Sequence, residues 1–354
     1  MLVQRMVRQT QYTNHIHQEQ TQNLDDKPPS SSSLKNEYSC IDNYNNKLTY
    51  PAIPSFIIAG AQKSGTTALY HIFAKHPLLV TTPEAEARFF TKRRNQIQIT
   101  TTQGEICSKG YEYYQLFNVT SKQDRMLRSG SIHAYEKSPL YILDPKIPEM
   151  ILKVCPWKPK IIIILRNPID RAYSQYLMVQ KRNQYFSSSA INEEDITFEE
   201  KMIQDFEELK KAGILTGTLD APEIGTWNHT SSYRKLRDNI LFKGFYSEQL
   251  KSWLRHFKLD HEMMVIQYET FEKNHLSVFR KLIKFIGLPP IDITEDDLSK
   301  DMGPIIPNTN QSLTNADRAQ MKSETRDLLK RLYKPYNNAL VDLLGNEWKD
   351  VWVN

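Results

Sequence analysis

Eight residues between an apolar run and an amphipathic run have the composition of a phosphate-binding loop. Residues 60–67 read Gly-Ala-Gln-Lys-Ser-Gly-Thr-Thr and follow the apolar run 56–59. A Gly/Ser/Thr-rich turn from a strand into a helix presents backbone N–H groups to an anion. In the Walker A pattern a lysine follows the second glycine, whereas here Thr66 stands at that place and Lys63 lies inside the loop. The loop therefore suits a terminal phosphate better than a magnesium-bridged triphosphate; a turn without any ligand is the alternative.

A second pattern that suits an anion follows the isoleucine-rich run 161–165. Arg166 comes at the end of this run, and Asn167 and Pro168 have the residue types of a helix cap and a first helical position. Ligands of open parallel sheets bind at the carboxyl ends of the strands. Arg166, with Ser174 two turns into the helix, can clamp a second phosphate. The alternative is a structural ion pair for Arg166 and a surface position for Ser174.

The elements that must position these residues alternate along the chain between apolar runs and amphipathic stretches. This alternation predicts an α/β fold with a central, mainly parallel sheet flanked by helices on both sides. The elements expected from periodicity and from capping residues are strands at 56–59, 161–165 and 263–266, and helices at 67–75, 247–257, 276–286 and 324–344.

The chain divides into a polar segment and one P-loop-like domain. Residues 1–50 are rich in Gln, Asn, Ser and Asp and show no periodicity, which predicts a disordered tail. Residues 51–354 form the expected domain. Within it, 183–239 is interpreted as an acidic helical insert, whose helix begins with the capping box Thr197-x-x-Glu200.

Composition narrows the function classes. The 354 residues carry 46 Lys and Arg against 41 Asp and Glu, a formal charge of +5, which does not indicate a nucleic-acid binder. No apolar run is long enough to span a membrane. Three widely spaced cysteines disfavour a metal site or a dense disulfide framework. Sequons occur at Asn118, Asn228 and Asn310, and in an Asn- and Thr-rich chain the preferred interpretation is chance.

Taken together, these motifs resemble those of the PAPS-dependent sulfotransferases, most closely the Golgi heparan sulfate type. The resemblance runs from about Ser55 to the C-terminus. The matching stretches, in the order of the family, are Lys63-Ser-Gly-Thr-Thr67, Glu86-Ala-Arg-Phe-Phe90, Glu136-Lys-Ser-Pro-Leu-Tyr141, Arg166-Asn-Pro-Ile-Asp-Arg-Ala-Tyr-Ser174 and Lys243-Gly-Phe-Tyr246. Each motif is moderately specific, and their joint occurrence in this order is what carries the resemblance.

The resemblance implies a donor and the residues that hold it. The donor of the family is adenosine 3′-phosphate 5′-phosphosulfate (PAPS), a co-substrate that carries two separate phosphates and needs no metal. The residues implied for its 5′-phosphosulfate are Lys63, Ser64, Gly65, Thr66 and Thr67. Arg166 and Ser174 are implied for its 3′-phosphate.

The resemblance also implies catalytic roles. Lys63 is expected to stabilise charge on the departing phosphate, and Glu86 to take the proton of the acceptor. Glu84 competes with Glu86, because alternate residues of an extended segment point to the same side. His133 is the next candidate, since the cytosolic members of the family use a histidine as base.

Acceptor and compartment are implied less sharply. Arg88 and Lys137 lie in motifs that contact donor or acceptor and are expected to anchor a carbohydrate acceptor, including an anionic sugar. The late basic Lys-Gly-Arg loop of the family has no counterpart in 303–318. The chain as written is expected to be soluble, whereas the family implies the Golgi lumen if an N-terminal anchor is missing. A catalytically silent binding module of the same fold and a P-loop kinase are the alternative functions.

Overall fold

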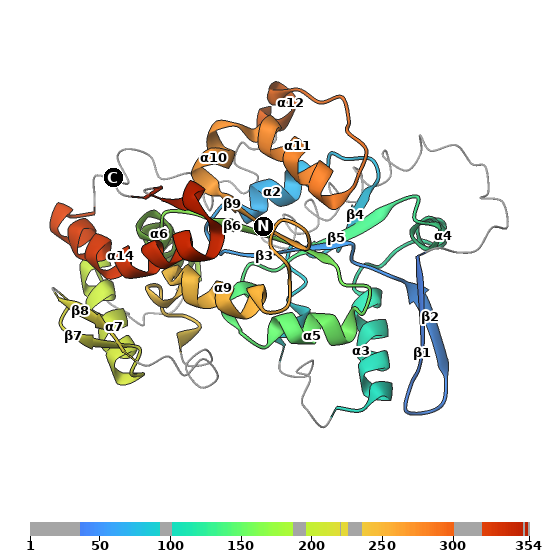
Figure 1. Ribbon diagram of the computed structural model, residues 1–354, viewed down its shortest axis with the longest axis horizontal. Helices are drawn as coiled ribbons and strands as arrows, with labels where there is room; N and C mark the ends of the chain where they lie inside the picture. Colours follow the sequence, from blue (N-terminus) through green and yellow to red (C-terminus); the bar gives the residue numbers. More distant parts are fainter. Residues whose placement is uncertain are drawn as a thin grey trace.

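A five-stranded parallel sheet forms the centre of the computed structural model (Figure 1). The structure describes residues 36–92, 101–186, 196–219, 221–225, 236–300, 321–349 and 351–352. The strand order is β4-β5-β3-β6-β9, with every neighbouring pair parallel. The strands are β3 (Phe56–Gly60), β4 (Leu79–Thr81), β5 (His133–Lys137), β6 (Lys160–Leu165) and β9 (Met263–Gln267). The predicted α/β fold with a mainly parallel sheet is confirmed.

Helices cover both faces of this sheet and separate two apolar cores. Alternate residues of β6 serve the two sides, since Ile162 and Ile164 belong to one core and Ile161 and Ile163 to the other. The helices of the first core are α2 (Thr66–Phe73), α10 (Tyr268–Lys273), α11 (His275–Ile286) and α12 (Glu295–Lys300). Those of the second include α3 (Gln103–Gln115), α5 (Ile147–Val154), α6 (Pro168–Phe186), α7 (Phe198–Lys211), α9 (Tyr246–Leu254) and α14 (Ser323–Leu344).

The remaining elements are short. Helix α4 (Ser121–Ser129) precedes β5, and single 3-10 turns are η1 (Phe89–Thr91), η3 (Tyr141–Leu143), η4 (Phe242–Gly244) and η5 (Asn346–Trp348). The capping box predicted for α7 is present, because the Thr197 hydroxyl accepts from the Glu200 backbone N–H at 3.2 Å and the Glu200 carboxylate accepts from Thr197 N at 2.7 Å. A small hairpin, β7 (Leu215–Gly217) with β8 (Pro222–Ile224), follows α7 and was not predicted.

The N-terminal segment corrects one expectation. Residues 1–50 were predicted to be a disordered tail, and this is wrong for 36–50; residues 1–35 lie outside the described part of the chain. Strands β1 (Glu37–Ile41) and β2 (Lys47–Pro51) form an antiparallel hairpin. A disulfide joins Cys40 to Cys107 of α3 across 67 residues. The Tyr50 ring is buried and stacks on the Tyr114 ring at 5.8 Å.

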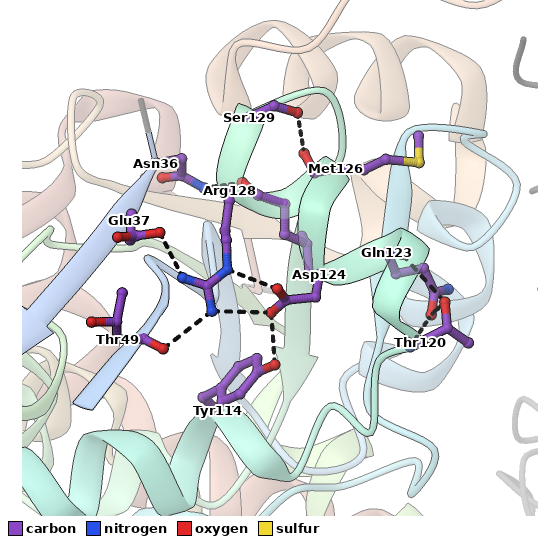
Figure 2. Close-up of polar contacts among 11 residues, drawn as sticks. Asn36, Glu37, Thr49, Tyr114, Thr120, Gln123, Asp124, Met126, Arg128 and Ser129 are labelled. Carbon is purple, nitrogen blue, oxygen red and sulfur yellow. Dashed lines mark hydrogen bonds and ion pairs between the residues drawn. The ribbon is translucent and has the colours of Figure 1, made fainter. Parts of the chain in front are cut away.

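Arg128 of α4 also holds the same hairpin, through an ion pair and hydrogen bonds (Figure 2). Its guanidinium donates to Glu37 at 2.6 Å, to Asp124 at 2.7 Å and to the Thr49 carbonyl oxygen at 3.1 Å. The Tyr114 hydroxyl donates to the other oxygen of Asp124 at 2.7 Å. The polar composition of the segment concealed these long-range partners, all of which lie beyond residue 100 or across the hairpin.

Candidate active site

The phosphate loop connects β3 to α2 in the conformation that its glycine requires. Gly65 has a φ of 89°, and a Cβ at this position would lie 2.7 Å from an atom of the Tyr268 ring. Only glycine fits both the positive φ and the aromatic neighbour. Gly65 caps α2 without a side chain, so no capping side chain covers the first N–H groups of the helix. Ser64 and Thr66, two residues of the loop, are buried.

Arg166 meets this loop from the end of β6. One terminal nitrogen of its guanidinium, Nη1, donates to the carbonyl oxygen of Lys63 at 3.3 Å, and the Arg166 Cζ lies 4.7 Å from the centre of the Tyr268 ring. Arg166 is only 5% exposed, and its Nη2 atom has no hydrogen-bond partner within the described residues. A buried guanidinium nitrogen without a partner is costly, and a bound anion would satisfy it. The two predicted anion sites are therefore adjacent at one edge of the sheet.

Ser174 is the least defined member of the predicted clamp. It lies on α6 two turns after Arg166 and is buried, as a residue on the inner side of the helix. Among the described residues, no hydrogen bond joins its hydroxyl to Arg166, so its role in holding a phosphate stays a prediction.

A carboxylate lies between two cations on the other side of the phosphate loop. Glu86 accepts from Arg88 Nε at 2.7 Å, and its second oxygen lies 3.6 Å from Lys137 Nζ. Lys137 ends β5 and also donates to the Thr67 hydroxyl at 3.0 Å. Its side chain is 3% exposed, and burial lowers the pKa of Lys137 while the Glu86 carboxylate opposes this shift. Lys137 thus links the predicted base to the predicted phosphate loop.

A buried hydrogen-bond chain supports the segment that carries Glu86. The backbone N–H of Arg88 donates to the Ser138 hydroxyl at 2.8 Å, and this hydroxyl donates to Glu136 at 2.8 Å. The Tyr113 hydroxyl donates to the other Glu136 oxygen at 2.6 Å. Glu136 is 0% exposed, and burial raises its pKa to about 7. Glu86 contributes to this shift through like-charge repulsion.

The competing bases are placed less favourably. Glu84 has an exposed side chain, and its backbone oxygen accepts from the Thr82 hydroxyl. His133 begins β5 and Lys137 ends it, so the two residues lie roughly 13 Å apart at opposite ends of the same strand. The His133 ring nitrogen Nδ1 lies 3.2 Å from the Ser55 hydroxyl, and burial lowers the His133 pKa.

Sequence reasoning gave no role to three residues that contact the anion site. Lys243 donates to the Gln62 side chain of the phosphate loop at 2.9 Å; its burial, followed by the nearby Arg171 charge, lowers the Lys243 pKa to about 7. The Tyr246 hydroxyl donates to the Arg166 carbonyl oxygen at 2.9 Å. Tyr268 directly follows β9, so the strand-end rule that singled out Arg166 would also have found Tyr268.

Two kinds of feature are absent from the described residues. Among them, no group of three or more His, Cys, Asp or Glu side chains is arranged to hold a metal ion. Within the same residues, none of the helices combines the length and the apolar character needed to span a bilayer. The stretch 303–318, where the sequence has no counterpart of the basic Lys-Gly-Arg loop, lies entirely outside the described part of the chain.

The chain is similar to known proteins over most of its length. Residues 54–335 match the family model described as a sulfotransferase domain. The bifunctional heparan sulfate N-deacetylase/N-sulfotransferase 4 of Mus musculus is 26% identical over 254 residues, which are 70% of this chain and 24% of the relative. A corresponding enzyme of Drosophila melanogaster is 24% identical over 83% of this chain and 26% of the relative. The chain thus spans about a quarter of the length of these relatives.

A solved structure supports the fold. The sulfotransferase of Alicyclobacillus acidocaldarius is 23% identical and has a TM-score of 0.52, covering 84% of this chain and 99% of that one. At this level of identity the likeness concerns the fold alone.

Proposed function

The chain belongs to the sulfotransferase domain family, and from this premise we propose that it transfers a sulfuryl group from PAPS to a hydroxyl or amine of a carbohydrate acceptor. The observation that carries the proposal is the link through Lys137, which lies 3.6 Å from the Glu86 carboxylate and donates to Thr67 of the phosphate loop. A base and an anion site must be neighbours for transfer between a bound donor and a bound acceptor.

The donor would bind along the edge where β3 and β6 end. Lys63 through Thr67 would hold the 5′-phosphosulfate, with N–H groups of the loop and of the α2 N-terminus as donors. Arg166 would hold the 3′-phosphate, which supplies the partner that its buried Nη2 lacks. Ser174 is proposed as a further ligand of this phosphate. No metal is required for either phosphate.

The transfer itself forms one bond to sulfur and breaks another. The acceptor oxygen or nitrogen bonds to the sulfur, its proton passes to the Glu86 carboxylate, and the bond from sulfur to the 5′-phosphate oxygen breaks. Negative charge then grows on that phosphate oxygen, where the Lys63 ammonium and the loop N–H groups would stabilise it. Glu86 is kept in position by Arg88 and Lys137.

The acceptor is proposed to be a glycosaminoglycan-like carbohydrate. The two related enzymes are named for heparan sulfate, an anionic polysaccharide. Arg88, whose side chain is more than half exposed, would meet an anionic sugar beside Glu86. Because the relatives are about four times longer than the region matched, acceptor choice is a proposal for this chain.

The proposed compartment is the Golgi lumen. Disulfides persist in oxidising compartments and are rare in the cytosol. The Cys40–Cys107 bridge therefore supports a luminal location, in agreement with the family resemblance.

The test is transfer of labelled sulfate from PAPS to heparan sulfate, chondroitin, simple glycans and small alcohols. We expect transfer to a polysaccharide acceptor, and we expect K63A and E86Q to lose it while unfolding at the temperature of the wild type. E84Q is the matched control, because Glu84 is an exposed carboxylate of the same segment. Equal losses in E84Q and E86Q, or full activity in E86Q, would show that the base is wrongly assigned.

Ligand-induced stabilisation separates the alternatives. A ligand at about 100 times its Kd adds roughly 2.7 kcal/mol to the stability of the folded state. Adenosine 3′,5′-bisphosphate should raise the Tm, and ATP with magnesium should not. The opposite pattern would favour a kinase, and a shift without any sulfate transfer would favour a silent binding module.

A further inference from the structure

The turn between α3 and α4 presents a sequon to solvent. Asn118, Val119 and Thr120 form an Asn-x-Thr triplet, and both Asn118 and Thr120 are exposed. Asn118 has a φ of 46°, and its backbone N–H donates to the Gln115 carbonyl oxygen at 3.2 Å. Because Asn118 is exposed, a large substituent there need not displace a core residue. The other two sequons lie outside the described residues.

The Cys40–Cys107 disulfide supports interpreting this triplet as a glycosylation site. A sequon is an acceptor only in a chain that enters the compartment where N-linked glycans are added, and that compartment is oxidising. The Cys40–Cys107 bridge points to the same compartment by chemistry that is independent of the sequon. The exposed triplet lies in the turn that follows α3, the helix that the disulfide holds, and the oxidising compartment that the disulfide indicates favours an acceptor site over a chance match.

We propose that Asn118 carries an N-linked oligosaccharide. In this step the Asn118 amide nitrogen loses a proton and bonds to the anomeric carbon of an oligosaccharide, and the diphosphate of the lipid-linked sugar donor is the leaving group. The glycan adds to the proposed function and does not depend on sulfate transfer.

A glycan on Asn118 would disturb neither the cap of α4 nor the proposed donor site. Thr120 uses its hydroxyl to accept from the Gln123 backbone N–H at 3.2 Å and so caps α4 (Figure 2), a contact that leaves Asn118 uninvolved. Helix α4 lies at one end of the molecule, and α6 and α14 lie at the other (Figure 1). A glycan on this turn therefore stands away from the part of the donor site formed at the start of α6.

Substitutions at Thr120 and Asn118 distinguish loss of the glycan from loss of the α4 cap. T120D removes the sequon but keeps a side chain that caps helices well, whereas T120S keeps both the sequon and the cap. N118Q replaces the asparagine to which the glycan would be attached and leaves the Thr120 cap intact. All three should unfold cooperatively, so loss of the glycan in T120D and N118Q cannot be attributed to loss of α4.

The experiment uses the full-length protein produced in animal cells from its natural coding sequence. Digestion with a peptide-N-glycosidase in ¹⁸O-labelled water converts a glycosylated asparagine into a labelled aspartate, which peptide mass mapping detects. We expect label at position 118 in the wild type and T120S, no label there in T120D and N118Q, and an intact Cys40–Cys107 bridge in each. Unlabelled Asn118 in protein with the intact bridge overturns the proposal, and so does reduced Cys40 and Cys107 in the same cells.

Discussion

Replacing Glu136 with glutamine should change how stability depends on pH. Burial raises the Glu136 pKa from 4.5 to about 7, so the folded state holds the proton more tightly than the unfolded chain does. One pKa unit corresponds to about 1.36 kcal/mol, which makes the full effect roughly 3 kcal/mol. The sign follows from linkage: the stability is fully present below about pH 4.5 and is lost as the pH rises through about 7.

E136Q has no charge to bury and should not show this loss. The amide keeps the shape of the carboxyl group but changes its hydrogen bonds to Tyr113 and Ser138, at a cost of about 1 kcal/mol that does not depend on pH. We therefore expect the stability of E136Q relative to the wild type to rise by about 3 kcal/mol between pH 4.5 and 8. His76 and His133 also titrate in folded and unfolded states, but they are common to both proteins and cancel in the difference.

The assay is urea unfolding at half-unit steps from pH 4.5 to 8, with the free energy of unfolding of E136Q minus that of the wild type plotted against pH. E84Q is the control, since its carboxylate is exposed and its difference plot should be flat within about 0.5 kcal/mol. A plot for E136Q as flat as that for E84Q would refute the reasoning, because Glu136 would then be as well solvated as a surface carboxylate.

Four further predictions address the donor site and the fold. G65A should abolish the Tm shift with adenosine 3′,5′-bisphosphate, because a Cβ would lie 2.7 Å from a ring atom at a φ of 89°; a normal shift would contradict the assigned loop. R166M should fold and lose the same shift, and unchanged binding would remove Arg166 from the site. The double variant C40A/C107A should lose roughly 4 kcal/mol in urea unfolding, from the entropy of a 67-residue loop, and a loss below 1 kcal/mol would argue against the bridge. The stability of K243M relative to the wild type should fall from pH 7 to 10, because the Lys243 pKa is lowered to about 7; a pH-independent difference would show that this lysine is not buried.

The sheet and the phosphate loop were predictable because local sequence determines them. Strands such as β6 are apolar on both faces, and the loop carries a glycine, Gly65, at a position where φ is positive and an aromatic ring lies close. The capping box of α7 is likewise a local signal. Each of these features depends on residues within a few positions of one another.

Features that depend on distant partners escaped prediction. Strand β5 was missed because it carries Glu136 and Lys137, two charged residues that are buried only through contacts with α2, α3 and the 84–88 segment. The N-terminal hairpin was missed because its residues are polar. Lys243 was noted only as part of a stretch that matches the family, and only the folded chain brings it to Gln62.

Local sequence also left the choice between the two glutamates open. Glu84 and Glu86 have the same spacing pattern in an extended segment, and the resemblance alone favoured Glu86. The geometry that distinguishes them, an exposed side chain against one held by Arg88 and Lys137, comes from the packing of β5 beside the segment.

The Ser138 hydroxyl restrains the segment that carries the proposed base, Glu86. It accepts from the Arg88 backbone and donates to Glu136, so it ties a surface turn to the buried end of strand β5. Glu86 therefore shares the rigidity of the strand although it belongs to a loop. A base restrained in this way loses little freedom when an acceptor arrives, so the cost of ordering falls on the sugar and not on the protein.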